Sequence, residues 1–372
     1  MTASPQATDG TGAAVPPPGN RYLHALRLGG LTLTNNLCLA PMAGFTNVAF
    51  RLIAKEVGGC GLVASEMVAA LGAITPANSE RFRTLTRNLP AEKPLAMQIY
   101  GRDPDLCAQT AAALVEAGAD LVDLNCGCPV KKAKQSGCGV ALMREPQLVG
   151  SIVAAIRAVV PPSIPVTVKM RLGFDAANRT MVEVARAAVD NGADALCVHA
   201  RTGESKHGTA IDLSGLAEVK RSVNVPVIAN GSMETAAAIR LAKDEGNADG
   251  YMIGRAACGD PWLFRNLIAE LTDGVRYAPG YAERKVLLER HFDLIVDLFG
   301  EARGVRVMRK YTFFYCNGLP GVRAFRDRFH RIESRAEFQD LVEDFFGRLS
   351  RGDLDHEQVE HLTLRDAGGA SE

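Results

Sequence analysis

A cysteine whose thiol could do chemistry lies near the middle of this chain. Cys128 sits between a glycine and a proline, just past the apolar run 120–127, where packing into a core is a less expected role than for a cysteine inside such a run. Cys126, Cys128 and Cys138 also form a C-x-C-x9-C pattern. That pattern could belong to a metal or iron–sulfur site, but no fourth ligand sits at a known spacing, so we predict no metal.

Polar side chains end or follow eight short apolar runs along the chain. A charged residue in one run could be a satisfied core pair, but polar groups at all eight favour a functional site. Enzymes built on a barrel of parallel strands place catalysis at the carboxyl ends of those strands. The residues are Pro41, Met42, Ala43 and Gly44 after the first run, Ser65 and Glu66 after the second, Gln98 in the third, Asn125 and Cys128 after the fourth, Lys169 and Arg171 in the fifth, His199 and Arg201 in the sixth, Asn230 and Gly231 after the seventh, and Gly254 and Arg255 after the eighth.

Three of these runs carry groups that suit an anionic ligand. Asn230-Gly231 and Gly254-Arg255 suggest a phosphate site, because glycines let backbone N–H groups approach the anion and arginine adds a forked donor. Either motif alone could also be turn chemistry with a surface arginine. Lys169 lies in the apolar run VTVKM and would be costly to bury without an anionic partner. The negatively charged N1/O2 edge of a reduced flavin would supply one.

The runs that carry these residues predict parallel strands. Segments with helical periodicity lie between them, such as Asp105–Glu116 and Gln147–Val159. Apolar strands alternating with helices indicate a parallel sheet buried on both faces, and eight such units close naturally into a (β/α)8 TIM barrel. An open doubly wound sheet is the alternative, but no G-x-G-x-x-G follows the first run. The predicted strands are Leu37–Gly44, Gly61–Met67, Pro94–Gly101, Asp120–Gly127, Pro165–Leu172, Ala195–Arg201, Val225–Ser232 and Gly250–Ala256.

Length and composition set the domain organisation. A chain of 372 residues has room for a barrel of about 250 residues and a smaller domain. We predict a disordered tail over 1–20, a catalytic α/β barrel over 21–275, an all-helical domain over 276–365 and a tail over 366–372. Helices are expected at Ala282–Phe299 and Ser334–Leu349. No secretion signal or membrane span is evident, and nine scattered cysteines favour a reducing cytoplasm.

Net charge is zero, but the charges are distributed unevenly. Between Arg303 and Arg335 there are nine Lys/Arg against two acids, whereas Ala336 to Glu372 holds ten acids against three arginines. The overall balance therefore hides a basic block that could meet an anion.

Seven motifs resemble the tRNA-dihydrouridine synthase family in order and spacing. They are APMAGFTNVAFR (40–51), SEM (65–67), LNCGCP (124–129), VTVKMR (166–171), VHAR (198–201), VIANG (227–231) and IGRAACGDPWLF (253–264). The resemblance implies FMN bound across the barrel mouth, NADPH as reductant and uridine in tRNA as substrate. It assigns FMN contacts to Pro41, Met42, Ala43, Gln98, Lys169, His199, Asn230, Gly231, Gly254 and Arg255. It places Asn125, Lys169, Arg171 and His199 near the uracil, with Cys128 as proton donor.

The implied reaction explains why these residue types are wanted. Hydride from the flavin would add at C6 of uracil, because the C5=C6 bond is conjugated to the C4 carbonyl. Negative charge then develops at C5 and O4. The cationic and amide side chains near the uracil would stabilise that charge, and the thiol would protonate C5.

RNA contacts are expected beside the site and in the C-terminal helical segment. Lys131 and Lys132 directly follow the cysteine loop and could contact phosphates. In the basic block, arginines are interleaved with aromatic residues, which suits an RNA surface, although aromatics at helical spacing are also ordinary core. We favour core for the aromatics. The arginines predicted to bind tRNA are Arg306, Arg309, Arg323, Arg326 and Arg328.

The chain departs from the family pattern after VHAR, where KHGTAIDL stands, and it is only loosely similar after Phe299. We expect a monomer with tRNA as partner. Two rival functions remain. One is an FMN-dependent barrel oxidoreductase acting on a free pyrimidine or enone, which would need no basic C-terminal domain. The other is a non-catalytic RNA-binding protein, which the complete set of strand-end polar groups argues against.

Overall fold

The computed structural model describes residues 19–70, 79–205 and 208–354. The predicted tail 366–372, almost all of the predicted tail 1–20, and the end of the predicted helical domain at 355–365 lie outside the described residues. In the described part, no helix is both long enough and apolar enough to cross a membrane.

The predicted barrel is confirmed. Its strands are parallel, and each lies within one predicted run. Hydrogen-bonded neighbours follow the order β3-β11-β10-β9-β8-β7-β6-β4. The ring closes between β3 and β4 through a parallel bridge from Cys38 to Leu62, with Leu39 N–H donating to the Leu62 carbonyl over 2.8 Å. The strands are β3 Leu37–Leu39, β4 Val63–Ala64, β6 Leu95–Tyr100, β7 Leu121–Cys126, β8 Val166–Arg171, β9 Ala195–His199, β10 Val227–Asn230 and β11 Gly250–Ile253. A short β5, Val68–Ala69, extends the pairing of β6.

Successive side chains of the barrel strands point alternately inward and outward, and they form two separate hydrophobic cores. Side chains that point outward pack under the surrounding helices, and those that point inward fill the barrel. The inward cluster is mostly small or slender, because the centre of the barrel is narrow: Cys38, Ala40, Leu62, Ala64, Ala96, Leu121, Ala195, Cys197, Ile228 and Met252.

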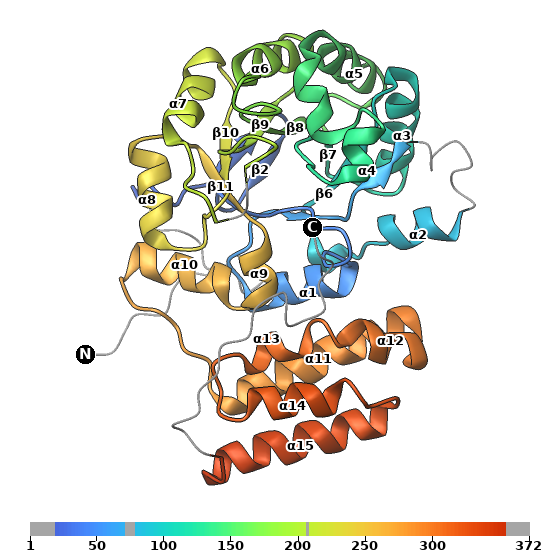
Figure 1. Ribbon diagram of the computed structural model, residues 1–372, viewed down its shortest axis with the longest axis vertical. Coiled ribbons are helices and arrows are strands. Elements are labelled where there is room, and N and C mark those ends of the chain that lie inside the picture. The colour runs from blue at the N-terminus through green and yellow to red at the C-terminus, as the bar shows by residue number, and fades with distance from the viewer. Residues whose placement is uncertain (1–18, 71–78, 206–207, 355–372) are drawn as a thin grey trace.

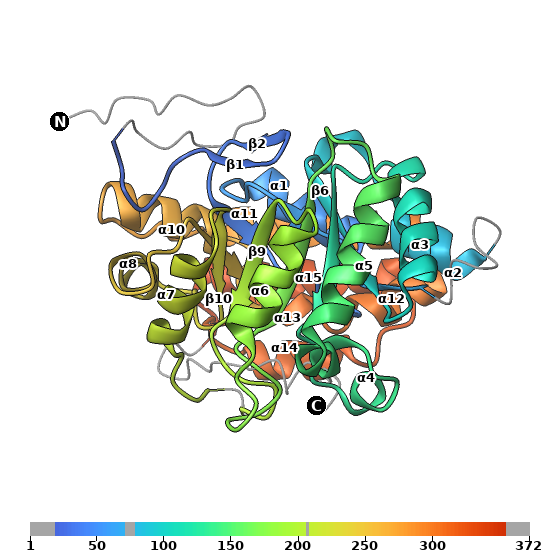
Figure 2. The ribbon, with the colours of Figure 1, turned by 90° about the horizontal axis from the view of Figure 1, so that it is seen from above.

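A β-hairpin that sequence reasoning missed closes the amino end of the barrel. Its antiparallel strands are β1 Leu26–Leu28 and β2 Leu31–Leu33. Leu26, Leu28 and Leu33 are buried against the inward cluster. Figure 2 shows the hairpin at one end of the barrel and α4 at the other. Each strand has only three residues, which is too short for periodicity to identify from sequence.

Helices cover the outside of the barrel, as Figure 1 shows. The helices predicted at 105–116 and 147–159 are present as α3 and α5. Several helices begin at a side-chain cap: Asn47, Asp103, Asp212 and Thr235 each accept from a backbone N–H three residues on. The longer helices are α1 Val48–Val57, α3 Pro104–Glu116, α5 Pro146–Val159, α6 Met181–Asp190, α7 Leu213–Ser222, α8 Ala236–Asp244 and α10 Leu263–Thr272. Shorter ones are α2 Glu80–Thr86, η2 Pro90–Glu92, α4 Lys131–Gln135, η3 Gly139–Arg144 and α9 Arg255–Gly259.

The C-terminal region is all-helical, as predicted. It comprises α11 Tyr281–Phe299, α12 Glu301–Met308, α13 Thr312–Cys316, α14 Val322–Phe329 and α15 Arg335–Arg351. Aromatic side chains form its core: the rings of Phe292 and Phe338 stack at 3.7 Å, and those of Phe325 and Phe345 at 4.4 Å. The preference for core over RNA contact is confirmed for the aromatics whose side chains are described in the basic block, namely Tyr311, Phe314, Tyr315, Phe325 and Phe329.

The helical region is bonded to the loop that follows β3. Tyr311 donates through its hydroxyl to the Phe45 carbonyl over 2.5 Å, and its ring stacks on Phe50 at 5.7 Å. The Lys310 ammonium donates to the Gly44 carbonyl. In Figure 1 these helices lie beside α1 on one flank of the barrel. The helical region therefore supports a loop of the barrel mouth.

Candidate active site

A cavity of about 680 Å³ opens at the carboxyl ends of the strands. Its size lies within the range of about 300–1,000 Å³ that is usual for small-molecule sites. The structure brings all predicted cofactor, substrate and catalytic residues to its wall. These are Pro41, Met42, Ala43, Gln98, Asn125, Cys128, Lys169, Arg171, His199, Asn230, Gly231, Gly254 and Arg255.

The loop that carries Cys128 is held from three sides. The side-chain oxygen of Asn125 accepts hydrogen bonds from the backbone N–H groups of Gly127 (3.1 Å) and Cys128 (3.0 Å). Arg171 Nε donates to the Gly127 carbonyl over 2.9 Å, and Val140 N–H donates to the Cys128 carbonyl over 3.0 Å. The thiol is thus presented at the cavity wall by a fixed loop.

Cys128 differs from the other cysteines in its exposure. All nine cysteines lie in the described part of the chain; Cys128 is half-buried and the remaining eight are buried. Burial raises the pKa of the Cys126 thiol well above its usual value. Cys126 belongs to the core between the barrel and its helices, in keeping with the interpretation that only Cys128 is placed to act as an acid.

Arg171 is more deeply engaged than predicted. It lines the cavity, but it is buried, and its Nη1 donates to the Thr202 carbonyl over 2.6 Å in addition to the bond to Gly127. Burial, with the nearby charge of Arg201, lowers the pKa of Arg171 to about 10, so the guanidinium stays charged at neutral pH. It therefore ties two rim loops together besides facing the cavity.

Within the protein Lys169 is paired with a neutral side chain, and the anionic partner predicted for it, a reduced flavin, stays a prediction. Its ammonium donates to the Asn230 side-chain oxygen over 2.8 Å, and the Asn230 amide donates to the Met252 carbonyl over 2.8 Å. The side chain is half-buried, and an ammonium has three donors, so it retains capacity toward a ligand. Its charge also favours the ionised form of the buried Asp123 carboxyl.

His199 and Gly231 meet at the carboxyl ends of the neighbouring strands β9 and β10. Gly231 has a φ of +98°, and a Cβ there would lie 2.6 Å from the His199 ring. Only glycine fits, and the backbone is left open to a ligand. The His199 ring nitrogen Nε2 lies 3.2 Å from Arg201 Nη1, and Arg201 Nη2 lies 2.8 Å from the Ser232 hydroxyl. Arg201, which the resemblance left without a role, positions the histidine.

Sequence reasoning missed a buried group that organises the site. Asp123 lies inside the barrel and accepts hydrogen bonds from Gln98 (2.6 Å) and Thr167 (2.6 Å). It could have been found from sequence, because residues 123 and 125 share one face of a strand and a carboxylate in an apolar run needs polar partners when it is buried. Met67, the last residue of the SEM motif, is half-buried at the cavity wall, and its sulfur lies 3.8 Å from the Asn125 amide nitrogen.

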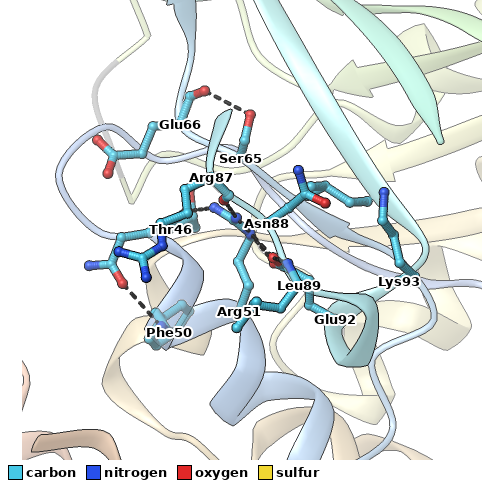
Figure 3. Close-up of polar contacts among 12 residues, drawn as sticks. Thr46, Phe50, Arg51, Ser65, Glu66, Arg87, Asn88, Leu89, Glu92 and Lys93 are labelled. Atoms are coloured by element: carbon cyan, nitrogen blue, oxygen red, sulfur yellow. Dashed lines mark hydrogen bonds and ion pairs between the residues drawn. The ribbon is translucent and has the colours of Figure 1, made fainter. Parts of the chain in front are cut away.

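A buried ion pair lies beneath the loop after β3 (Figure 3). Arg51 donates to both oxygens of Glu92, at 2.5 and 3.2 Å, and both side chains are at most 1% exposed. Arg51 Nη1 also donates to the Thr46 carbonyl over 2.7 Å, while the Thr46 hydroxyl accepts from Met42 N–H over 3.1 Å. The pair thereby fixes the loop that supplies Pro41, Met42 and Ala43 to the cavity.

The family model described as dihydrouridine synthase matches residues 38–350. The chain belongs to the dihydrouridine synthase family. The match continues well past Phe299, where the motifs become sparse. Membership makes the chain an oxidoreductase, and a non-catalytic RNA-binding protein does not fit it.

Relatives within the family match almost end to end. The chain is 37% identical over 332 residues to the tRNA-dihydrouridine synthase B of Pseudomonas syringae pv. tomato, covering 89% of this chain and 97% of that protein. It is 36% identical over 322 residues to the enzyme of the same name from Salmonella typhimurium, covering 86% and 99%. Among solved structures, a morphinone reductase variant in complex with tetrahydroNAD is similar, with a TM-score of 0.50 and 12% identity over 70% of this chain and 92% of that one. That likeness supports the barrel fold alone.

The residues predicted to bind RNA are spread over two regions of this family member. Lys131 is exposed at the first position of α4, and the side chain of Lys132 lies outside the described residues. Arg306, Arg323 and Arg328 are exposed on the helical domain. Some of the predicted arginines have partners within the protein: Arg309 is half-buried and donates to the Ile332 carbonyl over 3.1 Å, Arg326 pairs with Asp327 at 2.9 Å, and Arg328 pairs with Asp344 at 2.6 Å. The wall of the cavity, as far as the chain is described, includes none of these cations.

Proposed function

We propose that this chain is an FMN-dependent tRNA-dihydrouridine synthase, which reduces the C5=C6 bond of uridine in tRNA with NADPH as the reductant. The observation that carries the proposal is the single half-buried thiol, Cys128, at the wall of a cavity that also gathers cations and amides from the other strand ends. The names of the matched relatives support the substrate.

The residues of the cavity suit FMN. Gly231 has no Cβ, which would otherwise strike the His199 ring, so its backbone is open to a ligand. Arg255 adds a forked donor at the neighbouring strand end, and the two together suit a phosphate. Lys169 and Gln98 offer polar hydrogens that suit the edge of the ring. FMN bound there would supply hydride chemistry, and the protein would supply orientation and electrostatics.

The protein's own part in the reaction is to hold the base and deliver a proton. As hydride adds at C6, negative charge develops at C5 and O4. Lys169, Arg171 and His199 would stabilise that charge from fixed positions, which costs no reorganisation at the moment of reaction. The Cys128 thiol would then give its proton to C5, so that hydride and proton together saturate the bond. Lys131, Lys132 and the exposed arginines of the helical domain would hold the tRNA backbone.

Three measurements test the proposal. The purified protein should release FMN on denaturation, and replacing Lys169 should weaken flavin binding or slow its reduction. In anaerobic stopped-flow experiments, Cys128→Ala should keep flavin reduction by NADPH but lose about 10²–10⁴-fold in reoxidation of the reduced flavin by tRNA. Cys126→Ala, which removes a buried thiol from the same segment, is the control and should lose much less. Release of FAD, or wild-type reoxidation by Cys128→Ala, would overturn the assignment.

The substrate is tested separately from the chemistry. Reduced enzyme should be reoxidised by tRNA and not by free uridine at the same concentration of uracil. A tRNA carrying 5-bromouridine at the target should form a covalent adduct at Cys128, with bromide as the leaving group. Equal turnover of free uridine would favour an oxidoreductase of free pyrimidines.

A further inference from the structure

A directional chain of hydrogen bonds runs from the Cys128 loop into the barrel. Cys128 N–H donates to the Asn125 side-chain oxygen over 3.0 Å. The Asn125 amide nitrogen donates to the Gln98 side-chain oxygen over 2.8 Å. The Gln98 amide nitrogen donates to Asp123 Oδ2 over 2.6 Å. Every donor in this series points toward the same end, which is a carboxylate.

The two ends of the chain fix its direction. A side-chain amide can accept or donate, so Gln98 and Asn125 have no direction of their own. A backbone N–H can only donate, and an ionised carboxylate can only accept. Asp123 therefore obliges Gln98 to turn its nitrogen inward, and Gln98 in turn obliges Asn125 to turn its oxygen toward the N–H groups of Gly127 and Cys128.

Burial makes this chain effective. Asp123, Gln98 and Asn125 are at most 7% exposed, so water does not compete strongly for their hydrogen bonds. Burial raises the pKa of Asp123 to about 6, while bonds from Thr167 and Gln98 and the charge of Lys169 oppose the rise. The carboxyl is thus ionised at neutral pH, and its charge strengthens the chain.

We propose that Asp123 is a positioning residue for the reduction: through Gln98 and Asn125 it fixes the loop that presents the Cys128 thiol to the substrate. The same carboxylate orients Gln98, which lines the cavity where the flavin would bind. One buried charge thus holds the acid loop and a cofactor contact in a common frame. The consequence for catalysis rests on the proposed function, whereas the control of the loop does not.

The test removes and then restores the charge that sets the direction of the chain. In Asp123→Asn the neutral amide can still accept from Gln98 if its own nitrogen donates to the Thr167 hydroxyl, but the charge-assisted hydrogen bond is lost and the direction of the following amides is no longer enforced. In Asp123→Asn/Gln98→Glu, the carboxylate at 98 accepts from both asparagines, and Asn125 regains its orientation. Gln98→Glu alone places two carboxylates side by side and should disturb the loop as well.

Alkylation by iodoacetamide reports on the loop without any substrate. Eight of the nine cysteines are buried, so reaction of the flavin-loaded protein at pH 7.5 is selective for Cys128, which peptide mass mapping verifies. Loss of one buried hydrogen bond to a charged group should loosen the loop and raise the alkylation rate of Asp123→Asn on the order of tenfold. The double variant should return close to the wild-type rate. Thr167→Val removes the other bond to the same carboxylate and leaves the chain intact, so its rate should stay at the wild-type level.

Reoxidation by tRNA reports on the catalytic consequence. At saturating tRNA the rate constant of Asp123→Asn should fall by up to about 10²-fold, since a misplacement of the acid by about 1 Å can cost that much. The half-saturating tRNA concentration and the flavin content of Asp123→Asn should not change. The double variant is compared by alkylation alone, because Gln98 is itself a proposed flavin contact.

The outcomes separate this proposal from the preceding one. If Asp123→Asn is alkylated at the wild-type rate, or if the double variant is alkylated no more slowly than either single variant, Asp123 does not control the loop. If Asp123→Asn fails to fold, the alkylation rates of Gln98→Glu and of the double variant are compared, and a slower rate in the double variant supports control of the loop by the residue at 123. If tRNA does not reoxidise the wild-type flavin, the proposed function fails while the alkylation result stands.

Discussion

The buried ion pair between Arg51 and Glu92 gives the sharpest prediction about stability. Glu92→Gln keeps the shape of the side chain but leaves the Arg51 charge at 1% exposure without its carboxylate. The Arg51 bonds to the Thr46 and Arg87 carbonyls remain, so the loss is one of charge compensation and not of packing. Removing one partner of such a pair typically costs about 3–5 kcal/mol.

That cost is large against a typical stability of about 5–15 kcal/mol. At about 2–4 °C for each kcal/mol in a domain of this size, the midpoint of thermal unfolding should fall by roughly 6–20 °C. Arg51→Met should in addition weaken flavin retention, because Arg51 holds the Thr46 carbonyl and the Thr46 hydroxyl holds Met42 at the cavity.

Circular dichroism at 222 nm and flavin fluorescence, followed on heating, measure both effects. Glu145→Gln is the matched control: it makes the same substitution in an exposed ion pair with Arg102, where both side chains are more than 40% exposed, and should cost at most about 1 kcal/mol. In a double-mutant cycle, Arg51→Met with Glu92→Gln should cost less than the two single changes together, by up to about 3 kcal/mol. Additive costs, or a loss for Glu92→Gln no greater than that of Glu145→Gln, would refute the reasoning.

Two further predictions concern the helical domain. Burial lowers the pKa of His291 to about 3, so on acidification the unfolded chain binds the proton before the folded protein does. The contribution of His291 to stability is therefore retained above about pH 6.5, and the free energy of unfolding falls by about 1.4 kcal/mol per pH unit as the pH drops from there toward 3. His291→Asn should flatten that slope in urea unfolding from pH 4 to 7, and an unchanged slope would contradict the assignment. Reversing the charge at Arg306, Arg323 and Arg328 should weaken tRNA binding. The slope of log Kd against the logarithm of the salt concentration should fall by about one for each phosphate that the variant no longer neutralises. Arg27→Glu, at the opposite end of the barrel, is the control and should not alter binding.

The sequence revealed the barrel because its strands are continuous apolar runs, and in seven of the eight a polar side chain lies at the end of the run or directly after it. The carboxyl ends of parallel strands meet at one rim, so residues as distant in the chain as Met42 and Arg255 could be assigned to one site from sequence alone. The short hairpin β1–β2 escaped notice because three-residue strands carry almost no periodic signal.

Hydrogen-bond partners could not be predicted in the same way. Residue type and register placed Arg171 at the rim, but they did not reveal that its guanidinium would be divided between the Gly127 and Thr202 carbonyls. Nor did the basic block reveal that Arg309 would turn inward to the Ile332 carbonyl. Both outcomes depend on where backbone carbonyls from distant loops are left without other donors, which is a property of the assembled fold.

The position of the helical domain changes how the site is understood. From sequence it was a separate unit for RNA, joined to the barrel near residue 275. In the structure, Lys310 and Tyr311 bond to the carbonyls of Gly44 and Phe45, and Arg51 holds the same loop from below. The loop that supplies Met42 to the cavity is thus clamped between an ion pair in the barrel and two side chains of the helical domain. The helical domain therefore contributes to the position of the cavity wall, and the rings packed around Tyr311 reinforce this junction.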